Sequence, residues 1–330
     1  MKSKVFFFLF GIFYITQIYG QSSTQKLPII DMHCHIYSDQ IHPSFLQNYY
    51  KGDDYKLKDT VFTSPKNYVE HLKAVIEENS KYNVVLTYAS CDNKALDTIN
   101  KINTGNFLPS FEIWPTRELL NDKKYIETLK SKIKNGEVRG IGEVTNFYTG
   151  ISPNDPIMDT LYRIAEKYNI PIGIHCGQTG RGIQLNLYPE MRLEYSNPLL
   201  LQDVLIKFPK LRIYIMHAGV PFFPEETFAM LYMFPGLYVD ISAVLWESYA
   251  YGYFRESVKE FLTKAAKYGF IKRIMFGSDE WIYPGFIGLS IDYINQADFL
   301  TETQKRDILY NNAARFLRLS DAEIAKHHSK

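Results

Sequence analysis

The sequence of 330 residues predicts an α/β protein with a single domain, a (β/α)₈ barrel of the TIM-barrel type. The first observation is that short β-branched runs alternate with segments whose apolar residues recur at helical spacing. Eight strand-then-helix units of this kind follow one another between Leu27 and Leu319. The second observation is that no linker or repeat interrupts the series, and that 46% of the residues are hydrophobic, which suits one large core. A doubly wound open sheet is the alternative that the same alternation allows.

The elements can be placed by these runs. The expected strands lie at positions 27–35, 83–88, 107–113, 138–144, 171–175, 211–217, 237–241 and 271–279. The expected helices lie between and after them, at 65–82, 93–102, 123–134, 155–168, 198–208, 225–233, 254–268 and 292–319. The connection 37–64 is unusually long for a compact domain, so we expect it to act as a lid or binding loop.

The amino terminus has the pattern of an export signal. Two lysines precede an apolar run from Val5 to Tyr14, and the small residue Gly20 stands before a polar stretch. We expect residues 1–20 to be removed and residues 21–330 to form an exported barrel, periplasmic or secreted. The apolar run is shorter than the roughly 20 residues that a membrane-spanning helix needs. An uncleaved anchor is therefore the less favoured alternative, and no membrane partner is expected after cleavage.

The first strand carries two histidines that flank one residue, His33 and His35. Side chains alternate along a strand, so both imidazoles are expected on one side, with Cα atoms about 6.6 Å apart. At that separation both rings can reach one metal ion. The pattern alone fits equally well two buried histidines that hydrogen-bond to the backbone or to water.

Four more metal-competent side chains close other expected strands: Glu143, His175, His217 and Asp279. In a barrel the carboxyl ends of all strands meet on one face, where the active sites of this fold lie. Taken singly, each has an ordinary alternative as a solvated carboxylate, a hydrogen-bonded histidine or a helix cap. Taken together, imidazoles and carboxylates at one rim predict a site for one or two divalent ions, with Zn²⁺ the expected metal.

Three cysteines, Cys34, Cys91 and Cys176, do not make a disulfide framework, because an odd number leaves one unpaired. Cys34 and Cys176 each stand next to a candidate ligand histidine. Alternation along the strand turns them away from the histidines, toward the helical layer. We expect all three to be small buried side chains rather than nucleophiles.

The ordered set of motifs resembles the amidohydrolase superfamily, in particular its single-domain barrels. The matching pieces are Asp31-Met32-His33-Cys34-His35, Gly140-Ile141-Gly142-Glu143-Val144, His175-Cys176-Gly177, His217-Ala218-Gly219, Phe276-Gly277-Ser278-Asp279 and the closing Asn311-Asn312-Ala313-Ala314-Arg315-Phe316-Leu317. The sequence departs from the family pattern in one place, because the usual Trp-Pro after the strand-eight aspartate is here Glu280-Trp281.

The resemblance implies roles for the rim residues. His33, His35 and Asp279 would hold a first metal, joined by His175 in members with one metal. In members with two metals Glu143 would bridge, and His175 and His217 would hold the second ion. The sequence allows both arrangements. The implied catalytic residues are Asp279 and His217, with Asp279 placed to take a proton from a metal-activated water and pass it to the leaving group.

Substrate contacts are expected from the loops around the rim. Arg181 can clamp a carboxylate or phosphate, and Trp281 follows the eighth strand, although an Arg at the surface and a packed Trp are ordinary alternatives. Three further aromatic residues, Trp114, Tyr148 and Trp246, follow other strands and can line a pocket in the same way.

The candidate metal ligands at the rim and the charge composition together indicate a class of function. A formal charge of +1 with no block of lysines and arginines gives no reason to expect nucleic-acid binding. We expect an exported metal-dependent hydrolase that cleaves a C–O, C–N or P–O bond of a small molecule. A metal-dependent decarboxylase of the same barrel branch is the alternative. A barrel that has lost catalysis and only binds is a third possibility, which the intact set of ligands disfavours.

Overall fold

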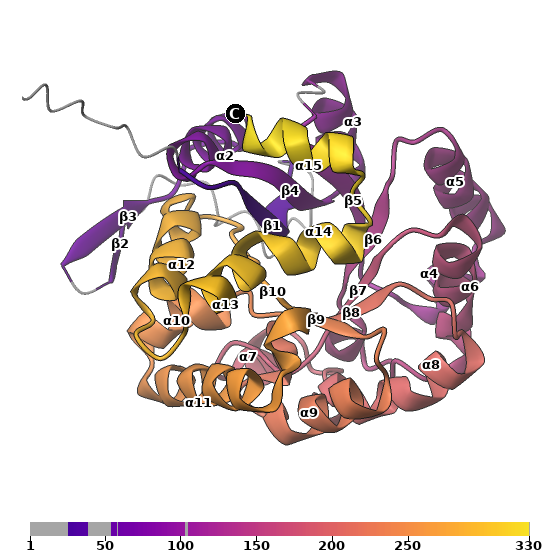
Figure 1. Cartoon of the computed structure of the whole chain (residues 1–330). Helices are drawn as coiled ribbons and strands as arrows, with labels where there is room; N and C mark the ends of the chain where they lie inside the picture. The colour runs from indigo at the N-terminus through magenta and orange to yellow at the C-terminus, as the bar shows by residue number, and fades with distance from the viewer. Residues whose placement is uncertain (1–25, 39–53, 58, 103–104, 330) are drawn as a thin grey trace, which may run out of the picture.

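The computed structural model describes residues 26–38, 54–57, 59–102 and 105–329, and it confirms the barrel (Figure 1). Eight strands form one sheet in the order β1-β4-β5-β6-β7-β8-β9-β10, which is their order along the chain. All neighbouring pairs in this order are parallel. Helices connect successive strands, so the architecture is the (β/α)₈ barrel that the alternation predicted.

The strands of the barrel are β1 (Ile29–Ile36), β4 (Val84–Cys91), β5 (Phe107–Ile113), β6 (Gly140–Val144), β7 (Ile172–His175), β8 (Ile213–Met216), β9 (Tyr238–Asp240) and β10 (Ile274–Met275). The ring closes between β1 and the chain that leaves β10. The Met32 amide donates to the Phe276 carbonyl at 2.9 Å, and the Ser278 amide donates to the His33 carbonyl at 3.1 Å. These bonds exclude the doubly wound open sheet, whose first and last strands stay apart.

The helices surround the strands in Figure 1. They are α2 (Tyr68–Tyr82), α3 (Asn93–Ile102), α4 (Arg117–Asn121), α5 (Lys123–Lys134), α6 (Asp159–Tyr168), α7 (Ile183–Asn186), α8 (Gln202–Lys207), α9 (Pro224–Met233), α10 (Val244–Ala250), α11 (Gly252–Tyr268), α12 (Gly285–Gln296), α13 (Glu302–Arg306), α14 (Asn312–Leu317) and α15 (Asp321–His328). Local sequence sets some of the ends. The Asn67 side chain accepts from the Glu70 amide at the start of α2, and Ser320 and Glu323 form a capping box at the start of α15.

Two expected boundaries were wrong. The closing helices expected at 292–319 begin earlier, at Gly285, and comprise α12, α13 and α14, with a π-helical turn at Asp307–Asn311 between the last two. Of the strand expected at 271–279, only Ile274–Met275 forms a regular strand, β10. A 3₁₀ turn occupies Phe270–Arg273 before it, and Asp279 after it has φ 51°, which no strand residue adopts.

The expected loop 37–64 contains a hairpin that the sequence analysis did not predict. Strands β2 (Asp54–Leu57) and β3 (Thr60–Thr63) pair antiparallel, and the hairpin extends away from the barrel at the left of Figure 1. Tyr55 and Phe62 pack against Phe286 of α12, with ring centroids 6.0 and 5.0 Å from it. Residues 39–53 lie outside the described residues, so the lid function expected of this loop stays a prediction.

The larger apolar cluster lies between strands and helices. All three cysteines belong to it, and each is free and fully buried, as expected. The smaller cluster includes Ile30 and Met32 of β1, whereas Cys34 and Ile36 of the same strand belong to the larger one. The register of β1 against β4 shifts between Asp31 and Cys34. Side chains before and after this bulge therefore do not follow one strict alternation.

Two tyrosines of the smaller cluster fill the space between strands. Tyr88 and Tyr214 meet edge to face with ring centroids 5.9 Å apart. The Tyr88 hydroxyl donates to the Ile141 carbonyl at 2.9 Å, and the Tyr214 hydroxyl donates to the Met32 carbonyl at 3.1 Å. Both rings lie against a glycine, since a Cβ at Gly140 would overlap the Tyr88 ring and a Cβ at Gly173 would stand 2.7 Å from Tyr214 Cζ.

The expected export signal, residues 1–20, lies outside the described residues. Within the part of the chain that the structure covers, no helix combines the length and the apolar character needed to cross a membrane.

Replacing Gly140 by Ala should lower the stability of the barrel. The new methyl group would lie 2.5 Å from Tyr88 Cε2, in a fully buried place where the ring cannot swing into solvent. Overpacking of this kind costs about 1 to 3 kcal/mol, measurable as a lower midpoint of urea unfolding. Gly252→Ala is the matched control, because nothing lies within 4 Å of its Cβ position. Equal midpoints for the two variants would contradict the prediction.

Candidate metal centre

The six side chains expected at the rim gather in one buried space. His33 and His35 lie on β1, Glu143 on β6 and His175 at the end of β7, while His217 and Asp279 follow β8 and β10. Their relative exposures run from 0% to 8%. Burying so many titratable groups together is costly unless they are paired or bind a metal, so their presence here indicates a functional site.

One group of three ligand atoms comes from β1 and the chain after β10. Asp279 Oδ1 lies 3.3 Å from His33 Nε2 and 3.0 Å from His35 Nε2, and these two nitrogens are 3.2 Å apart. Carboxylate and imidazole atoms that converge in this way can hold one divalent cation.

A second group shares His33 with the first. His33, Glu143 and His217 also place one ligand atom each within 4.8 Å of the others. Glu143 Oε1 is 3.0 Å from His217 Nε2 and 2.5 Å from His175 Nδ1, so His175 joins this group through the carboxylate. The structure therefore brings together every residue that the sequence assigned to the metal.

The outer nitrogen of each β1 histidine is held by a protein group. His33 Nδ1 donates to Ser242 Oγ at 2.8 Å, and the Ser242 hydroxyl donates to Asp240 Oδ1 at 2.5 Å. His35 Nδ1 lies 3.1 Å from Glu112 Oε2 and 2.7 Å from the Tyr37 hydroxyl. Such partners fix the tautomer and the ring orientation, so each Nε2 lone pair points into the shared space.

The other two histidines are held in the same manner. His217 Nδ1 donates to the Ser242 carbonyl at 3.1 Å, and His175 Nε2 donates to the Gln178 carbonyl at 2.6 Å. The remaining nitrogens, His217 Nε2 and His175 Nδ1, face Glu143 and lie 3.2 Å from each other. With all four outer nitrogens donating, the inner ones present lone pairs to one another and to carboxylate oxygens, which is repulsive unless a cation or an extra proton lies among them. The donor set thus fits a metal ion.

The electrostatics of the cluster agree with this arrangement. Burial by itself would raise the pKa of Glu143 and of Asp279, but the neighbouring histidines outweigh it and hold both pKa values below their usual range. Burial lowers the pKa of His175, whereas His217, despite its burial, has a pKa raised to about 9 by its hydrogen bond to Glu143. Both carboxylates are therefore ionised near neutral pH and available as ligands.

The backbone at two of the ligands is strained. His217 has φ 59° and Asp279 has φ 51°, in the left-handed region that residues with a side chain avoid. Each such residue costs about 1 kcal/mol or more, and strain of this kind collects at functional sites. Close packing supports the turn after β10, because a Cβ at Gly277 would lie 2.9 Å from the Cβ atoms of His33 and Ser242.

A cavity of about 260 Å³ opens beside the cluster. His35, Glu143, His175 and Asp279 belong to its wall. Much of the remaining wall is aromatic: Tyr37, Trp114, Tyr148, Tyr188, Trp246 and Trp281. Trp114 stacks on Tyr188 with ring centroids 5.4 Å apart, so the two rings form one packed part of this wall.

The residues expected to bind substrate have different positions. Trp281 lines the cavity, as do the other three aromatic residues that follow strands. Glu280, which with Trp281 replaces the usual Trp-Pro, is buried and contacts His71 Nε2 of α2 through both carboxylate oxygens at 3.0 Å. Arg181 is exposed, and the wall includes its neighbours Gly180 and Ile183 but not Arg181 itself. A substrate role for Arg181 stays a prediction.

The residues that hold the candidate ligands were not predicted from the sequence. Glu112 and Asp240 carry a carboxylate at the end of an apolar strand, the same signal that identified Glu143 and Asp279. Ser242 and Gln178 give no such signal, since they act in part through a backbone carbonyl.

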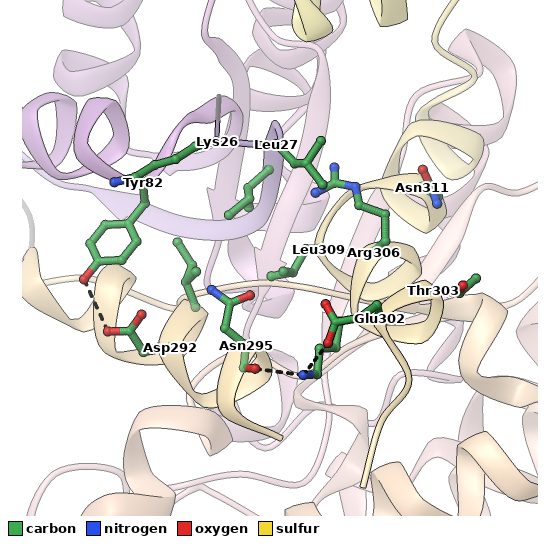
Figure 2. A pocket seen from close by; sticks show the side chains of 13 residues that line it. Lys26, Leu27, Tyr82, Asp292, Asn295, Glu302, Thr303, Arg306, Leu309 and Asn311 are labelled. Atoms are coloured by element: carbon green, nitrogen blue, oxygen red, sulfur yellow. Dashed lines mark hydrogen bonds and ion pairs between the residues drawn. The ribbon is translucent and has the colours of Figure 1, made fainter. Parts of the chain in front are cut away.

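A larger hollow of about 690 Å³ lies near the amino-terminal end of β1 (Figure 2). Its carboxylates are paired with other residues of its own wall: Asp292 accepts from the Tyr82 hydroxyl at 3.4 Å, and Glu302 accepts from Lys305 at 2.9 Å. None of the six candidate ligands belongs to its wall. The smaller cavity at the carboxyl ends of the strands is therefore the candidate active site.

Comparison with known proteins decides the family. A family model described as Amidohydrolase matches residues 30–319, nearly the whole described barrel. The chain belongs to the amidohydrolase family. This match confirms the resemblance that the rim motifs indicated. A search of curated proteins found no match to this amidohydrolase.

Several solved structures share the fold. An uncharacterized TIM-barrel protein from Bordetella bronchiseptica is similar, with a TM-score of 0.60 and 18% identity over 88% of this chain and 99% of that one. A 2,6-dihydroxybenzoate decarboxylase from Rhizobium has a TM-score of 0.57 and 15% identity over 89% and 99%. A probable 2-pyrone-4,6-dicarboxylic acid hydrolase from Acinetobacter baumannii has a TM-score of 0.57 and 14% identity, over 89% of this chain and 100% of that one. At sequence identities this low, the similarity to these structures shows a shared fold alone.

Removing the β1 ligands should remove bound metal. The double variant His33→Ala/His35→Ala loses two of the three ligand atoms in the group that includes Asp279, so we expect elemental analysis of the purified protein to show the loss of at least one equivalent of divalent metal. His328→Ala, at an exposed position of α15, is the control. Full metal loading of a folded double variant would show that the metal binds elsewhere.

Proposed function

We propose that this amidohydrolase-family protein is a metal-dependent hydrolase that uses an activated water on a C–O, C–N or P–O bond of a small molecule. The observation that carries the proposal is the convergence of His33, His35 and Asp279 at the wall of a cavity, with Glu143 3.5 Å from His35 Nε2. The six candidate ligands suit one or two ions, of which Zn²⁺ is the one we propose.

The metal would be held by His33, His35 and Asp279, with Glu143, His175 and His217 available for a second ion. A divalent cation in this place supplies Lewis acidity, which makes a water molecule a stronger nucleophile near neutral pH. The protein supplies the rest. Asp279 is ionised and can accept a proton from the attacking water and return it to the leaving group, while the aromatic wall orients the substrate and excludes bulk water.

Hydrolysis is preferred to decarboxylation because of Glu143. A carboxylate that contacts His175 and His217 beside the first ligand group offers places for two cations, which is the arrangement suited to activating a water and polarising the scissile group together. A decarboxylase of this branch is the second candidate. It would differ from the hydrolase in needing one metal and an acid–base group that protonates carbon.

Replacing Asp279 by Asn should leave the fold intact and lower kcat by about 10² or more, the usual contribution of a positioned general base. The amide keeps the size of the carboxylate but cannot accept the proton at neutral pH. Circular dichroism, metal content and kcat should be measured together. Asp298→Asn, an exposed position, is the control. An Asp279→Asn enzyme with wild-type kcat would rule out the assigned proton transfer.

A substrate screen should separate the two reactions. Lactones, esters, amides and phosphoesters are tested beside 2-oxo and aromatic carboxylic acids, and hydrolysis of one of the first four classes is expected. Glu143→Gln should lower metal content and turnover in parallel, because the neutral amide is a weaker ligand. Turnover of the acids alone, with CO₂ released at full rate by one metal per chain, would decide for the decarboxylase.

We also propose that the protein is exported, with cleavage after Gly20. The support is the lysine-flanked apolar run at positions 5–14 and the small residue before the polar stretch. Intact-mass measurement of protein from the native cell envelope or medium should give a chain that begins at Gln21. A chain that retains Met1 and stays in the cytosol would refute export.

A further inference from the structure

Glu247 is a buried acid in the wall of the cavity that the mechanism above does not use. It lies on α10, the short helix after β9, and is 6% exposed. Its Oε1 accepts a hydrogen bond from Gln178 Nε2 at 3.0 Å. Its Oε2 has no hydrogen-bond partner in the part of the chain that the structure describes. Leaving a buried carboxyl oxygen unpaired is unfavourable, so a ligand that satisfies it gains affinity.

The chemical state of Glu247 determines what that ligand must offer. Burial raises the pKa of Glu247 to about 8, against the hydrogen bond from Gln178, which lowers it, and with Asp279 raising it further. The raised pKa favours the neutral, protonated form of this acid over the carboxylate. Because Oε1 already accepts from Gln178, the acid proton belongs on Oε2, where it is a donor without an acceptor.

The position of Glu247 ties it to the reacting end of the cavity. Gln178, which donates to Glu247 through its side chain, accepts from His175 Nε2 through its carbonyl at 2.6 Å. One residue thus spans from a candidate metal ligand to the acid. The carboxyl group turns easily about its last bond, since rotation about an sp³–sp² bond has broad minima. Oε2 is itself buried, so a substrate atom meets the hydroxyl of the acid once the carboxyl group has turned toward the cavity.

We propose that Glu247 is a substrate-binding residue, which donates a hydrogen bond from its carboxyl group to an acceptor oxygen of the substrate. The acceptor is a carbonyl, ester or carboxylate oxygen on a small molecule whose flat part lies against the aromatic wall. The inference rests on the proposed function in one respect, namely that this cavity is the substrate site. It adds a class of ligand: molecules with an exposed oxygen acceptor, in preference to ammonium compounds.

Binding of three probes to the metal-loaded protein tests this inference without any turnover. Benzoate carries a carboxylate acceptor, acetophenone carries a carbonyl acceptor, and benzylamine carries a cation that only donates. Calorimetry should show that the wild-type protein binds benzoate or acetophenone in preference to benzylamine. Glu247→Ala should weaken binding of the acceptor probes about tenfold or more, as expected for the loss of a buried hydrogen bond. Glu247→Gln, which keeps a donor N–H, should stay within about threefold of wild type.

Controls keep the result specific. Glu256→Gln changes an exposed acid on α11 and should bind all three probes as the wild type does. If Glu247→Ala does not fold, Glu247→Met replaces it, because Met keeps the volume but has no donor. The separate effects on benzoate and acetophenone show whether the acceptor is charged or neutral.

Two results would overturn the inference. The first is a Glu247→Gln variant that binds the acceptor probes as weakly as Glu247→Ala does, which would mean that a hydrogen-bond donor at this position does not hold the acceptor oxygen. The second is a wild-type protein with no preference for the acceptor probes over benzylamine. A hydrolase screen that fails while the probe pattern holds would refute the proposed function alone, and an active hydrolase without the probe pattern would refute this inference alone.

Discussion

The rim of this barrel depends on one electrostatic constraint: four imidazoles and two carboxylates share a space from which water is almost excluded. Protons on the outer nitrogens leave lone pairs and negative oxygens facing inward at 2.5 to 3.3 Å. Such a set is favourable only when positive charge lies among its members, whether a proton or a metal ion. Each outer nitrogen has a fixed acceptor, so the histidine rings have little freedom to turn away from one another. A cation among the inner atoms therefore relieves the repulsion.

The local conformations around the rim follow from the same constraint. Aiming a side chain from the end of a strand back into the barrel axis needs backbone shapes that a regular strand lacks. The chain provides them through left-handed residues at His217 and Asp279 and a register shift in β1. These features lower stability locally, and the tyrosines and apolar side chains packed between the strands compensate for it. The side chains that stabilise the barrel therefore lie between the strands, whereas the strained candidate ligands lie at the rim.

Much of the fold could be predicted from the sequence, because eight apolar runs of the right length alternate with helical periodicity and each ends at a turn. That the six candidate ligands gather at one rim was also predictable, because the carboxyl ends of all barrel strands meet on one face. The β2–β3 hairpin could not be predicted, because its residues Tyr55 and Phe62 are stabilised by Phe286, more than two hundred positions away. Glu247 could not be predicted as a site residue for a similar reason. Its burial and its bond to Gln178 depend on the packing of α10, which no local pattern indicates.

Ser242 has a consequence of its own. Its hydroxyl accepts from His33 and its carbonyl accepts from His217, so one residue orients a histidine in each of the two ligand groups, and Asp240 behind it anchors both. Because Ser242 contacts both histidines, the orientations of His33 and His217 are coupled. A substitution that retunes one half for a different ion or substrate shifts the other as well, so new specificity in this barrel is more easily acquired through the cavity wall than through the ligands themselves.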